Sequence, residues 1–402
     1  MNIQTPYFLI DKEELEKNVN TFSNALQKYW PNSIFSYSVK TNSLPWVLEF
    51  MHSKKIRAEV VSDEEYQLSK LCGFSDDQIV YNGPIKGNDQ LESALKGKAI
   101  INIDSEHELM YILENYHLVS DNIGVRVNVP THIFKKEDIG YEEDGFRFGF
   151  SDETGRLEKV INDLKKVGIS KFGLHFHVNS VSRSNDVYSS ISKYAKNIIN
   201  KYQLAPSYID IGGGFFGGLP TKPSAESYIA TIREELEDVV DINTTKLIIE
   251  PGSAIIGSCV ELYSSVLDLK ETQNVEIVTT DASRLHIDPL WKKQNYFYRI
   301  EKMGNESLNS GKDKLICGYT CMDHDRIMKL DKEVSVAAGD QIIFEKVGAY
   351  SITLGGPFIR YYPKVLVKEE NDYLIVRDEM NVGDYYSLHR SKTYRGIKND
   401  QK

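Results

Sequence analysis

A stretch of nine residues from Cys317 to Asp325, CGYTCMDHD, brings together two thiols, one imidazole and two carboxylates. Groups of these types could bind a metal ion, take part in catalysis or stabilise an ordinary polar turn. A zinc site would need a second pair such as CxxC or CxxH, and the remaining cysteines, Cys72 and Cys259, are isolated along the chain. The stretch is therefore not interpreted as a metal site, and the other two possibilities stay open.

Lys40 follows directly on an apolar run in SYSVKTN (36–42). Burial would lower the pKa of such a lysine and free its amine for Schiff-base chemistry. A solvated lysine at the end of a strand is the more common arrangement, and this stretch alone does not decide between the two.

Two further runs end in groups suited to a charged ligand. Asp210 precedes IGGGFFGG (211–218), where N–H groups without side chains could surround a phosphate. A flexible turn explains the same residues, and the pattern is not the GxGxxG of dinucleotide sites. Glu250 ends the apolar run KLIIE. A buried carboxylate needs a partner, either a protonated ring nitrogen or a basic side chain on a neighbouring helix.

His175 and His177 are two residues apart on an expected strand and therefore share one face of it. The pair could bind a metal, one ring could pack against a flat ligand, or both could be hydrogen-bonded core side chains. No acidic residue or cysteine completes an obvious ligand set, so no metal is predicted.

The elements that must position these residues alternate, from about residue 30 to 255, between short β-branched runs and amphipathic stretches. We expect eight strands, at 34–39, 57–61, 78–82, 99–103, 123–129, 172–178, 207–211 and 246–250. The stretches DEEYQLSKLCGF (63–74) and SAESYIATIREELEDVV (224–240) are typical of helices with a Ser or Asp cap. Eight such units in about 225 residues favour a closed (β/α)8 barrel over an open sheet.

In such a barrel the chemistry takes place at the carboxyl ends of the strands. Polar residues recur at that position, namely Lys40, Ser62, Asn82, Asp104, His177 and Glu250, together with the glycine run. This repeated placement indicates an active site more strongly than any single residue in it.

After about residue 258 the pattern changes to strand-like runs separated by turns, at 259–269, 275–281, 314–319, 333–337, 341–347, 364–370 and 373–379. We expect a mostly β domain over 258–390, joined by the segment 1–25, whose run YFLID (7–11) could add one strand. The barrel would occupy 26–257, and 391–402 would form a loose tail.

The chain has 402 residues and a formal net charge of -10, with Lys and Glu mixed along it. Because there is no basic stripe, nucleic acids and membrane surfaces are not expected as partners. There is no N-terminal signal and no run of about 18 apolar residues. The 4 cysteines are too scattered for a disulfide framework, so we expect a cytoplasmic protein.

Six motifs, taken in order, resemble those of the fold type III pyridoxal-phosphate-dependent decarboxylases, the family of the diaminopimelate and ornithine decarboxylases. They are SYSVKTN (36–42), HFHVNS (175–180), DIGGGF (210–215), IIEPG (248–252), CGYTCMDHD (317–325) and VGAY (347–350). The resemblance runs from about residue 6 to 368. Within the family, the paired histidines favour the diaminopimelate decarboxylases. It implies an α/β fold with an N-terminal (β/α)8 TIM-type barrel and a C-terminal β-domain, as in alanine racemase.

The resemblance also implies a cofactor, pyridoxal 5'-phosphate, and a homodimer with two shared active sites. Lys40 would bind the cofactor covalently, with Glu59 nearby. His177 would stack on its ring, and Glu250 would keep the ring nitrogen protonated so that the ring can accept electrons as CO2 leaves. The phosphate would be held by Gly212, Gly213, Gly214, Ser180, Ser253 and Tyr350.

In this family the cysteine of the CGYTCMDHD motif comes from the neighbouring subunit. Cys321 would therefore return a proton to the substrate carbon, and Cys317 would be a buried strand residue. The following residues, Met322, Asp323 and His324, would face the distal end of the substrate.

Two positions depart from the family pattern. Ser253 stands where the family usually has an arginine, so it can donate a hydrogen bond to the phosphate but brings no charge. Met322 stands where an acid usually receives the distal ammonium of the substrate, and a thioether cannot pair with an ammonium ion. We therefore expect a decarboxylase of an amino acid or amino-acid-like substrate, similar to diaminopimelate decarboxylase but with altered distal specificity.

Two alternatives remain. An amino-acid racemase on the related fold is less favoured, because such racemases hold the ring nitrogen with a cation and Glu250 is an acid. A catalytically silent homologue that binds the cofactor is also less favoured, because such proteins tend to lose the lysine or the cysteine, and this chain keeps both Lys40 and Cys321.

Overall fold

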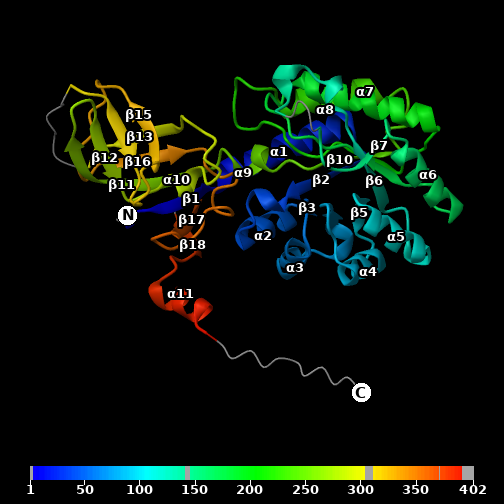
Figure 1. The fold of residues 1–402 in the computed structure, drawn as a ribbon, viewed down its shortest axis with the longest axis horizontal. Helices are drawn as coiled ribbons and strands as arrows, with labels where there is room; N and C mark the ends of the chain where they lie inside the picture. The colour runs from blue at the N-terminus through cyan, green and yellow to red at the C-terminus, as the bar shows by residue number, and fades with distance from the viewer. Residues whose placement is uncertain (1–2, 141–144, 304–310, 371, 392–402) are drawn as a thin grey trace. The chain divides into compact units, whose positions relative to one another are not determined.

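The computed structural model describes the chain except for residues 1–2, 141–144, 304–310, 371 and 392–402. The described chain divides into two compact units (Figure 1). A barrel unit comprises 11–260 and 346–353, and a β unit comprises 1–10, 261–345 and 354–402.

The barrel unit contains a closed parallel barrel of eight strands, as the alternating pattern predicts. The strands are β2 (Ser33–Ser38), β3 (Arg57–Val60), β4 (Ile79–Tyr81), β5 (Ile100–Ile103), β6 (Ile123–Asn128), β8 (Gly173–His175), β9 (Tyr208–Asp210) and β10 (Lys246–Ile249). Each pairs with the next, and β10 closes the ring by pairing Leu247 with Ser33 of β2. A short ninth strand, β7 (Phe150–Ser151), adds to β6 and was not expected.

Helices lie outside this barrel (Figure 1). They are α1 (Lys12–Tyr29), α2 (Pro45–Ser53), α3 (Asp63–Leu71), α4 (Asn88–Lys96), α5 (Glu106–Glu114), α6 (Arg156–Lys166), α7 (Asn185–Tyr202), α8 (Ala225–Leu236) and the single turn α9 (Ser253–Ile256). Helix α8 begins at its predicted cap, Ser224, which accepts a hydrogen bond from Ser227 N. Helix α3 is capped one residue earlier than predicted: Ser62 accepts from Glu65 N, and Asp63, the expected cap, is the first helical residue. The strand–helix alternation therefore directs each polar strand end to one rim.

The segment 11–25 differs from expectation. It was expected with the β-domain, but it forms most of α1, which lies in the barrel unit. Asp11 caps this helix by accepting a hydrogen bond from Glu14 N, and Asn18 Nδ2 donates to Ile255 O at 2.9 Å. The apolar face of α1 buries Leu15, Val19 and Phe22, which holds the helix to the barrel.

Beneath the polar rim, the barrel interior contains a layer of large side chains: Ile34, Val80, Ile100, Tyr208 and Ile248. Two glycines make room for the ring of Tyr208. A Cβ on Gly173 would lie 2.2 Å from this ring, and a Cβ on Gly124 would lie 2.3 Å from its hydroxyl. The layer closes the floor of the barrel, so the polar groups above it are confined to one end.

The β unit is built on a nine-stranded sheet. Its strands are β1 (Tyr7–Asp11), β11 (Val260–Glu271), β12 (Glu276–Thr280), β13 (Phe297–Glu301), β14 (Lys314–Cys317), β15 (Arg326–Leu330), β16 (Gln341–Glu345), β17 (Lys364–Glu369) and β18 (Asp372–Arg377), with helices α10 (Arg284–Ile287) and α11 (Val382–His389). The predicted strand at YFLID is confirmed, because β1 lies between β11 and β17.

Three details of this unit differ from the sequence prediction. The run 333–337 is not a strand, because the bonds from Val334 N to Asp331 O and from Asp340 N to Ala337 O close turns there. Strands β13 and β15 and helix α11 were not predicted. The expected tail, 391–402, lies outside the described residues except for Ser391. Among the described helices, none has the length and apolar character needed to cross a bilayer.

Candidate active site

Lys40 lies in a short 3-10 turn directly after β2, and its amine is held by an acid on the next strand. Lys40 Nζ lies 2.7 Å from Glu59 Oε2, and Ser38 Oγ donates to the same oxygen at 2.6 Å. Glu59 is buried, whereas the Lys40 side chain is 38% exposed. The predicted neighbourhood of Lys40 and Glu59 is therefore present in the structure.

The pKa of Lys40 is opposite in direction to the sequence prediction. Burial alone pushes this pKa down, as expected, but the negative charges of Glu59 and Glu250 push it up further, so the net pKa lies above the ordinary value for lysine. The prediction was wrong because it considered burial without the two carboxylates that the barrel brings to the same end. The amine is held as an ammonium ion before any ligand arrives.

Asn82, at the end of β4, connects the two acids of the site. Its Nδ2 donates to Glu59 Oε1 at 3.1 Å and to Glu250 Oε1 at 2.6 Å. Its own carbonyl accepts from Asn102 Nδ2, which also donates to Asp210 Oδ2 at 3.0 Å. The sequence pattern marked Asn82 only as a polar strand end, and Asn102 carried no signal because it lies inside an apolar strand.

Asp210 and Glu250 are both buried. Burial raises the pKa of Asp210 to about 7. Burial, together with the neighbouring charges of Asp210 and Glu59, raises the pKa of Glu250 well above its ordinary value. This shift favours the protonated form of Glu250, whose proton a basic ring nitrogen could accept.

His175 lies next to these acids, contrary to the expectation that no acidic partner stands near the histidine pair. The ligand atoms of His175, Asp210 and Glu250 all lie within 4.8 Å of one another, and His175 Nε2 is 3.9 Å from Glu250 Oε2. The partners come from β9 and β10, which are remote in sequence but adjacent to β8 in the barrel. The neutral His175 ring could bind a cation, but burial raises the pKa of both Asp210 and Glu250 and so favours their protonated forms, which are poor cation ligands.

His177 packs against the glycine run. Gly213 N donates to His177 Nδ1 at 3.2 Å. A Cβ on Gly212, whose φ is 72°, would lie 2.4 Å from the same nitrogen, and a Cβ on Gly213 would lie 2.3 Å from Glu250 O. Burial and the charges of Arg126 and Lys40 lower the pKa of His177 to about 3. The ring is therefore neutral at physiological pH.

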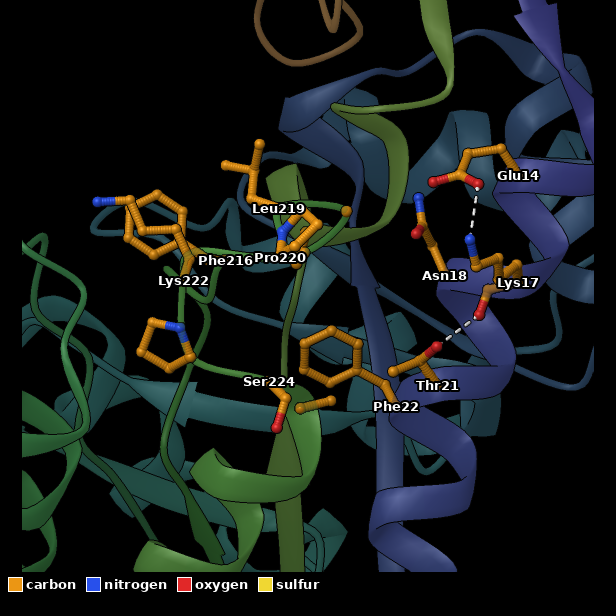
Figure 2. A pocket seen from close by; sticks show the side chains of 15 residues that line it. Glu14, Lys17, Asn18, Thr21, Phe22, Phe216, Leu219, Pro220, Lys222 and Ser224 are labelled. Atoms are coloured by element: carbon orange, nitrogen blue, oxygen red, sulfur yellow. Dashed lines mark hydrogen bonds and ion pairs between the residues drawn. The ribbon is translucent and has the colours of Figure 1, made fainter.

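The remaining predicted phosphate ligands lie in the same unit. Tyr350 N donates to the carbonyl of Thr41, the residue after Lys40, at 2.9 Å. Ser180 Oγ accepts from Arg183 N at 3.0 Å, and Ser253 opens α9. A cavity of about 290 Å³ adjoins the far end of the glycine run, between α1 and the segment from Phe216 to Ala225 (Figure 2).

These residues fit pyridoxal phosphate on two observations. Among the described residues, neither nitrogen of the buried His175 ring has a hydrogen-bond partner, and buried polar atoms normally find one. Side chains are excluded from Gly212 and Gly213, and the N–H of Gly214 has no partner within the described chain. The N–H groups of Gly212 and Gly213 donate to Asp210 Oδ1 and His177 Nδ1, so Gly214 offers the N–H that a phosphate could accept. A narrow surface with this N–H, beside a neutral ring and an amine, suits a flat phosphorylated aldehyde.

The CGYTCMDHD stretch lies in the β unit, as the turn between β14 and β15. Asp325 holds this turn: its carboxylate accepts from Thr320 Oγ1 at 2.6 Å and from Arg284 N at 2.9 Å. Cys317 is half-buried at the end of β14, whereas Cys321 is exposed at the turn. The structure thus favours a polar turn that presents one thiol.

The residues after Cys321 form a partly aromatic surface. Met322 is half-buried, and Asp323 and His324 are exposed. The centroid of the His324 ring lies 4.7 Å from that of the Trp291 ring. The guanidinium of Arg284 lies 4.9 Å from the centroid of the same Trp291 ring. Arg284 is already paired with Asp288 at 3.0 Å.

Comparison with known proteins agrees with this geometry. The chain matches the model of the pyridoxal-binding domain of pyridoxal-dependent decarboxylases over residues 12–257. It is 26% identical over 383 residues to a diaminopimelate decarboxylase of Bacteroides thetaiotaomicron, which covers 92% of this chain and 96% of that protein. It is also 23% identical over 371 residues to antizyme inhibitor 1 of Rattus norvegicus, covering 86% and 78%.

A solved structure of similar fold is diaminopimelate decarboxylase from M. jannaschii in complex with L-lysine. It shares 21% sequence identity and a TM-score of 0.83, and covers 96% of this chain and 92% of that one. The common fold is a barrel with a β-domain. The chain therefore belongs to the fold type III pyridoxal-phosphate-dependent decarboxylases, a family of carboxy-lyases whose cofactor is pyridoxal 5'-phosphate.

Proposed function

We propose that this chain removes CO2 from an amino-acid-like substrate in the manner of a diaminopimelate decarboxylase, but recognises the distal end of that substrate differently. The observation that carries this proposal is Met322, next to the exposed thiol of Cys321 in the β14–β15 turn. A distal ammonium ion brought against a thioether would lose hydration without gaining a charge partner.

Lys40 is the residue that would attach the cofactor. Its ion pair with Glu59 at 2.7 Å fixes the position of the amine. After attachment, Glu59 would remain beside the lysine nitrogen and favour a positive charge there. This arrangement supports the role that the sequence motif suggests for both residues.

Glu250 would supply the proton at the ring nitrogen. Its raised pKa favours the protonated carboxyl group, and the hydrogen bond from Asn82 Nδ2 keeps that group in place. The cofactor contributes a ring that accepts electrons from the bond that breaks. A protonated ring nitrogen strengthens that capacity, so Glu250 would favour release of CO2 over simple proton exchange.

His177 would lie against one face of the ring. Its neutral imidazole is anchored by Gly213 N, and the glycine run would bring backbone N–H groups to the phosphate. Ser180, Ser253 and Tyr350 would complete the phosphate ligands. The close packing of Gly212 on His177 supports a single arrangement of ring and phosphate sites.

Cys321 would return the proton to the substrate carbon after CO2 leaves. The exposure of its thiol supports a role outside its own β unit, and we propose that it completes the site of a neighbouring subunit in a homodimer. All four cysteines are free, which supports a reducing, cytoplasmic setting.

The surroundings of Met322 favour a substrate whose distal amine is absent or masked, as in a conjugate. Trp291 and His324 offer aromatic surface near the turn. Arg284 is committed to Asp288 and to the carbonyl of Lys293. A neutral or acylated distal group would therefore meet this surface at lower cost than an ammonium ion.

The test is CO2 release from a panel of amino acids by the enzyme loaded with pyridoxal phosphate. The panel contains ornithine, lysine and diaminopimelate, each beside a derivative acylated on the distal amine. We expect the acylated compounds to have the higher kcat/KM. Efficient turnover of free ornithine or lysine would overturn the proposed distal specificity, while leaving the decarboxylase assignment intact.

The alternatives separate in the same assay. A racemase would abolish the optical activity of an amino acid without CO2 release. A catalytically silent homologue would release no CO2. This alternative is kept because one relative by sequence is named antizyme inhibitor 1 and not a decarboxylase. Borohydride reduction should fix the cofactor to the wild-type chain and not to Lys40→Ala. A wild-type protein that cannot be loaded with cofactor would favour the silent homologue.

A further inference from the structure

Arg183 lies in the loop between β8 and α7, three residues after Ser180, with a left-handed backbone (φ 49°). Two hydrogen bonds fix this conformation. Arg183 N donates to Ser180 Oγ at 3.0 Å, and Arg183 O accepts from the hydroxyl of Tyr228 at 2.6 Å. A left-handed conformation is costly for a residue with a Cβ. The two hydrogen bonds offset this conformational cost and hold Arg183 in position.

The same Tyr228 hydroxyl accepts a hydrogen bond from Phe216 N at 3.4 Å. It therefore joins the Arg183 loop to the end of the glycine run. The guanidinium of Arg183 lies 5.2 Å from the centroid of the Phe216 ring, and Tyr188, which packs against Tyr228, donates to Gly213 O at 3.0 Å. Arg183 therefore contacts the glycine run in two ways: its backbone carbonyl through the Tyr228 hydroxyl, and its guanidinium through the Phe216 ring.

A second cation, Lys222, contacts Phe216, with Nζ 4.9 Å from the ring centroid (Figure 2). The two differ in how firmly they are held. Arg183 is half-buried and its loop is anchored by Ser180 and Tyr228, whereas Lys222 is exposed. Lys222 therefore serves as a matched control, a cation on the same ring without the anchoring.

The charge of Arg183 is not used elsewhere in the described chain, where it forms no ion pair with a carboxylate. Arg126, another arginine of this barrel end, is committed to Asp104 at 2.8 Å. Lys40 is committed to Glu59. Arg183 is consequently a half-buried cation beside the glycine run whose charge no carboxylate of the described chain pairs.

We propose that Arg183 supplies the positive charge that binds the phosphate of the cofactor, in place of the arginine that Ser253 replaces. A phosphate dianion held only by neutral donors would lack a positive charge beside it, and a planar guanidinium supplies that charge together with two parallel hydrogen bonds. The fixed backbone of Arg183 and the Phe216 ring limit the freedom that the side chain loses on binding.

The test measures cofactor binding, not turnover. The full-length chain, stripped of cofactor, is titrated with pyridoxal phosphate and separately with pyridoxal, which has the aldehyde but no phosphate. Wild type, Arg183→Gln and Lys222→Gln are compared, with denaturant unfolding of each stripped protein as a control for folding.

Arg183→Gln should weaken binding of pyridoxal phosphate roughly ten- to hundredfold and leave pyridoxal binding within about twofold. Lys222→Gln should leave both within about twofold. Equal binding of pyridoxal phosphate by wild type and Arg183→Gln overturns the proposal, and so does a loss that is equal for the two ligands. If Arg183→Gln does not fold, Arg183→Lys is used, which should show a smaller loss confined to pyridoxal phosphate; no such loss overturns the proposal.

Discussion

Lys40 Nζ and Glu59 Oε2 lie 2.7 Å apart at the carboxyl ends of two adjacent barrel strands, β2 and β3. The acid is buried, and the lysine, which is partly exposed, has no salt bridge to any other acid in the described chain. This pair sets the protonation state of the amine that must react with the cofactor.

Glu59→Gln should therefore make the lysine easier to deprotonate. Since burial already favours the neutral amine and Glu59 opposes it, removing the charge lowers the pKa of Lys40. The rate of covalent attachment of pyridoxal phosphate, followed by absorbance from pH 6 to 10, should reach its plateau at a lower pH. The control is Glu64→Gln, an exposed acid in the first turn of α3. An unchanged pH profile for Glu59→Gln would contradict the role given to the pair.

Gly212→Ala should abolish high-affinity cofactor binding, because its Cβ would lie 2.4 Å from His177 Nδ1. Gly155→Ala is a closely matched control: its φ is 74° against 72°, but nothing lies within 4 Å of the added Cβ. Both variants carry the backbone cost of a left-handed alanine, roughly 1 kcal/mol. Fluorescence titration with pyridoxal phosphate should separate them, and similar affinities in the two variants would argue against the close packing of ring and glycine.

Asn82→Ala should lower the free energy of unfolding by roughly 2–4 kcal/mol, since two buried carboxyl groups lose a donor and Asn102 loses an acceptor. Asn82→Asp should cost more at pH 8 than at pH 5, because it adds a negative charge beside Glu59 and Glu250. Urea unfolding of the cofactor-free protein measures both. The control is Asn32→Ala, which removes an exposed hydrogen bond to Asn243 O. If Asn82→Ala lowered the free energy of unfolding by no more than this control does, the bridging role of Asn82 would be refuted.

The loss of folding stability as the pH falls below neutral should depend on His177. Its pKa in the folded protein is about 3, below the roughly 6.5 of an unfolded histidine. The unfolded chain therefore binds the proton first, so the stability contributed by the neutral ring is complete above about pH 6.5 and is lost as the pH falls toward 3.

His177→Phe cannot take up this proton in either state. Its urea midpoint should fall less steeply than that of the wild type between pH 7.5 and 4.5, when both are measured without cofactor. His107→Gln changes an exposed histidine and should leave the wild-type slope unaltered. Parallel slopes for wild type and His177→Phe would show that the ring is not buried as neutral imidazole.

Met322→Glu should raise kcat/KM for lysine and ornithine at least about tenfold relative to the wild type, because a carboxylate next to Cys321 can pair with a distal ammonium ion. His324→Gln changes a neighbouring side chain of the turn without adding charge and should give no such gain. Equal activity of Met322→Glu and wild type on both substrates would place the distal specificity elsewhere.

Local signals in the sequence were sufficient for the eight barrel strands, the Ser224 cap of α8 and the strand at YFLID, because periodicity and capping depend on residues close in the chain. They failed at 333–337, where turns closed by Asp331 and Asp340 override an apolar, β-branched run. They also assigned residues 11–25 to the wrong unit, since the partners of α1, including Ile255, are more than 200 residues away.

By itself, the sequence determined the family, the cofactor and the candidate residues on the barrel strands, because the motifs carry residue types whose chemistry is local. Only the tertiary structure decided their charge states. The pKa of Lys40 rises instead of falling, the pKa of Glu250 rises as well, and Asp210 and Glu250 lie beside His175, because strands remote in sequence bring their ends together in one buried space. The same closure unites the Arg183 loop with the glycine run through Tyr228, a contact that no spacing in the sequence reveals.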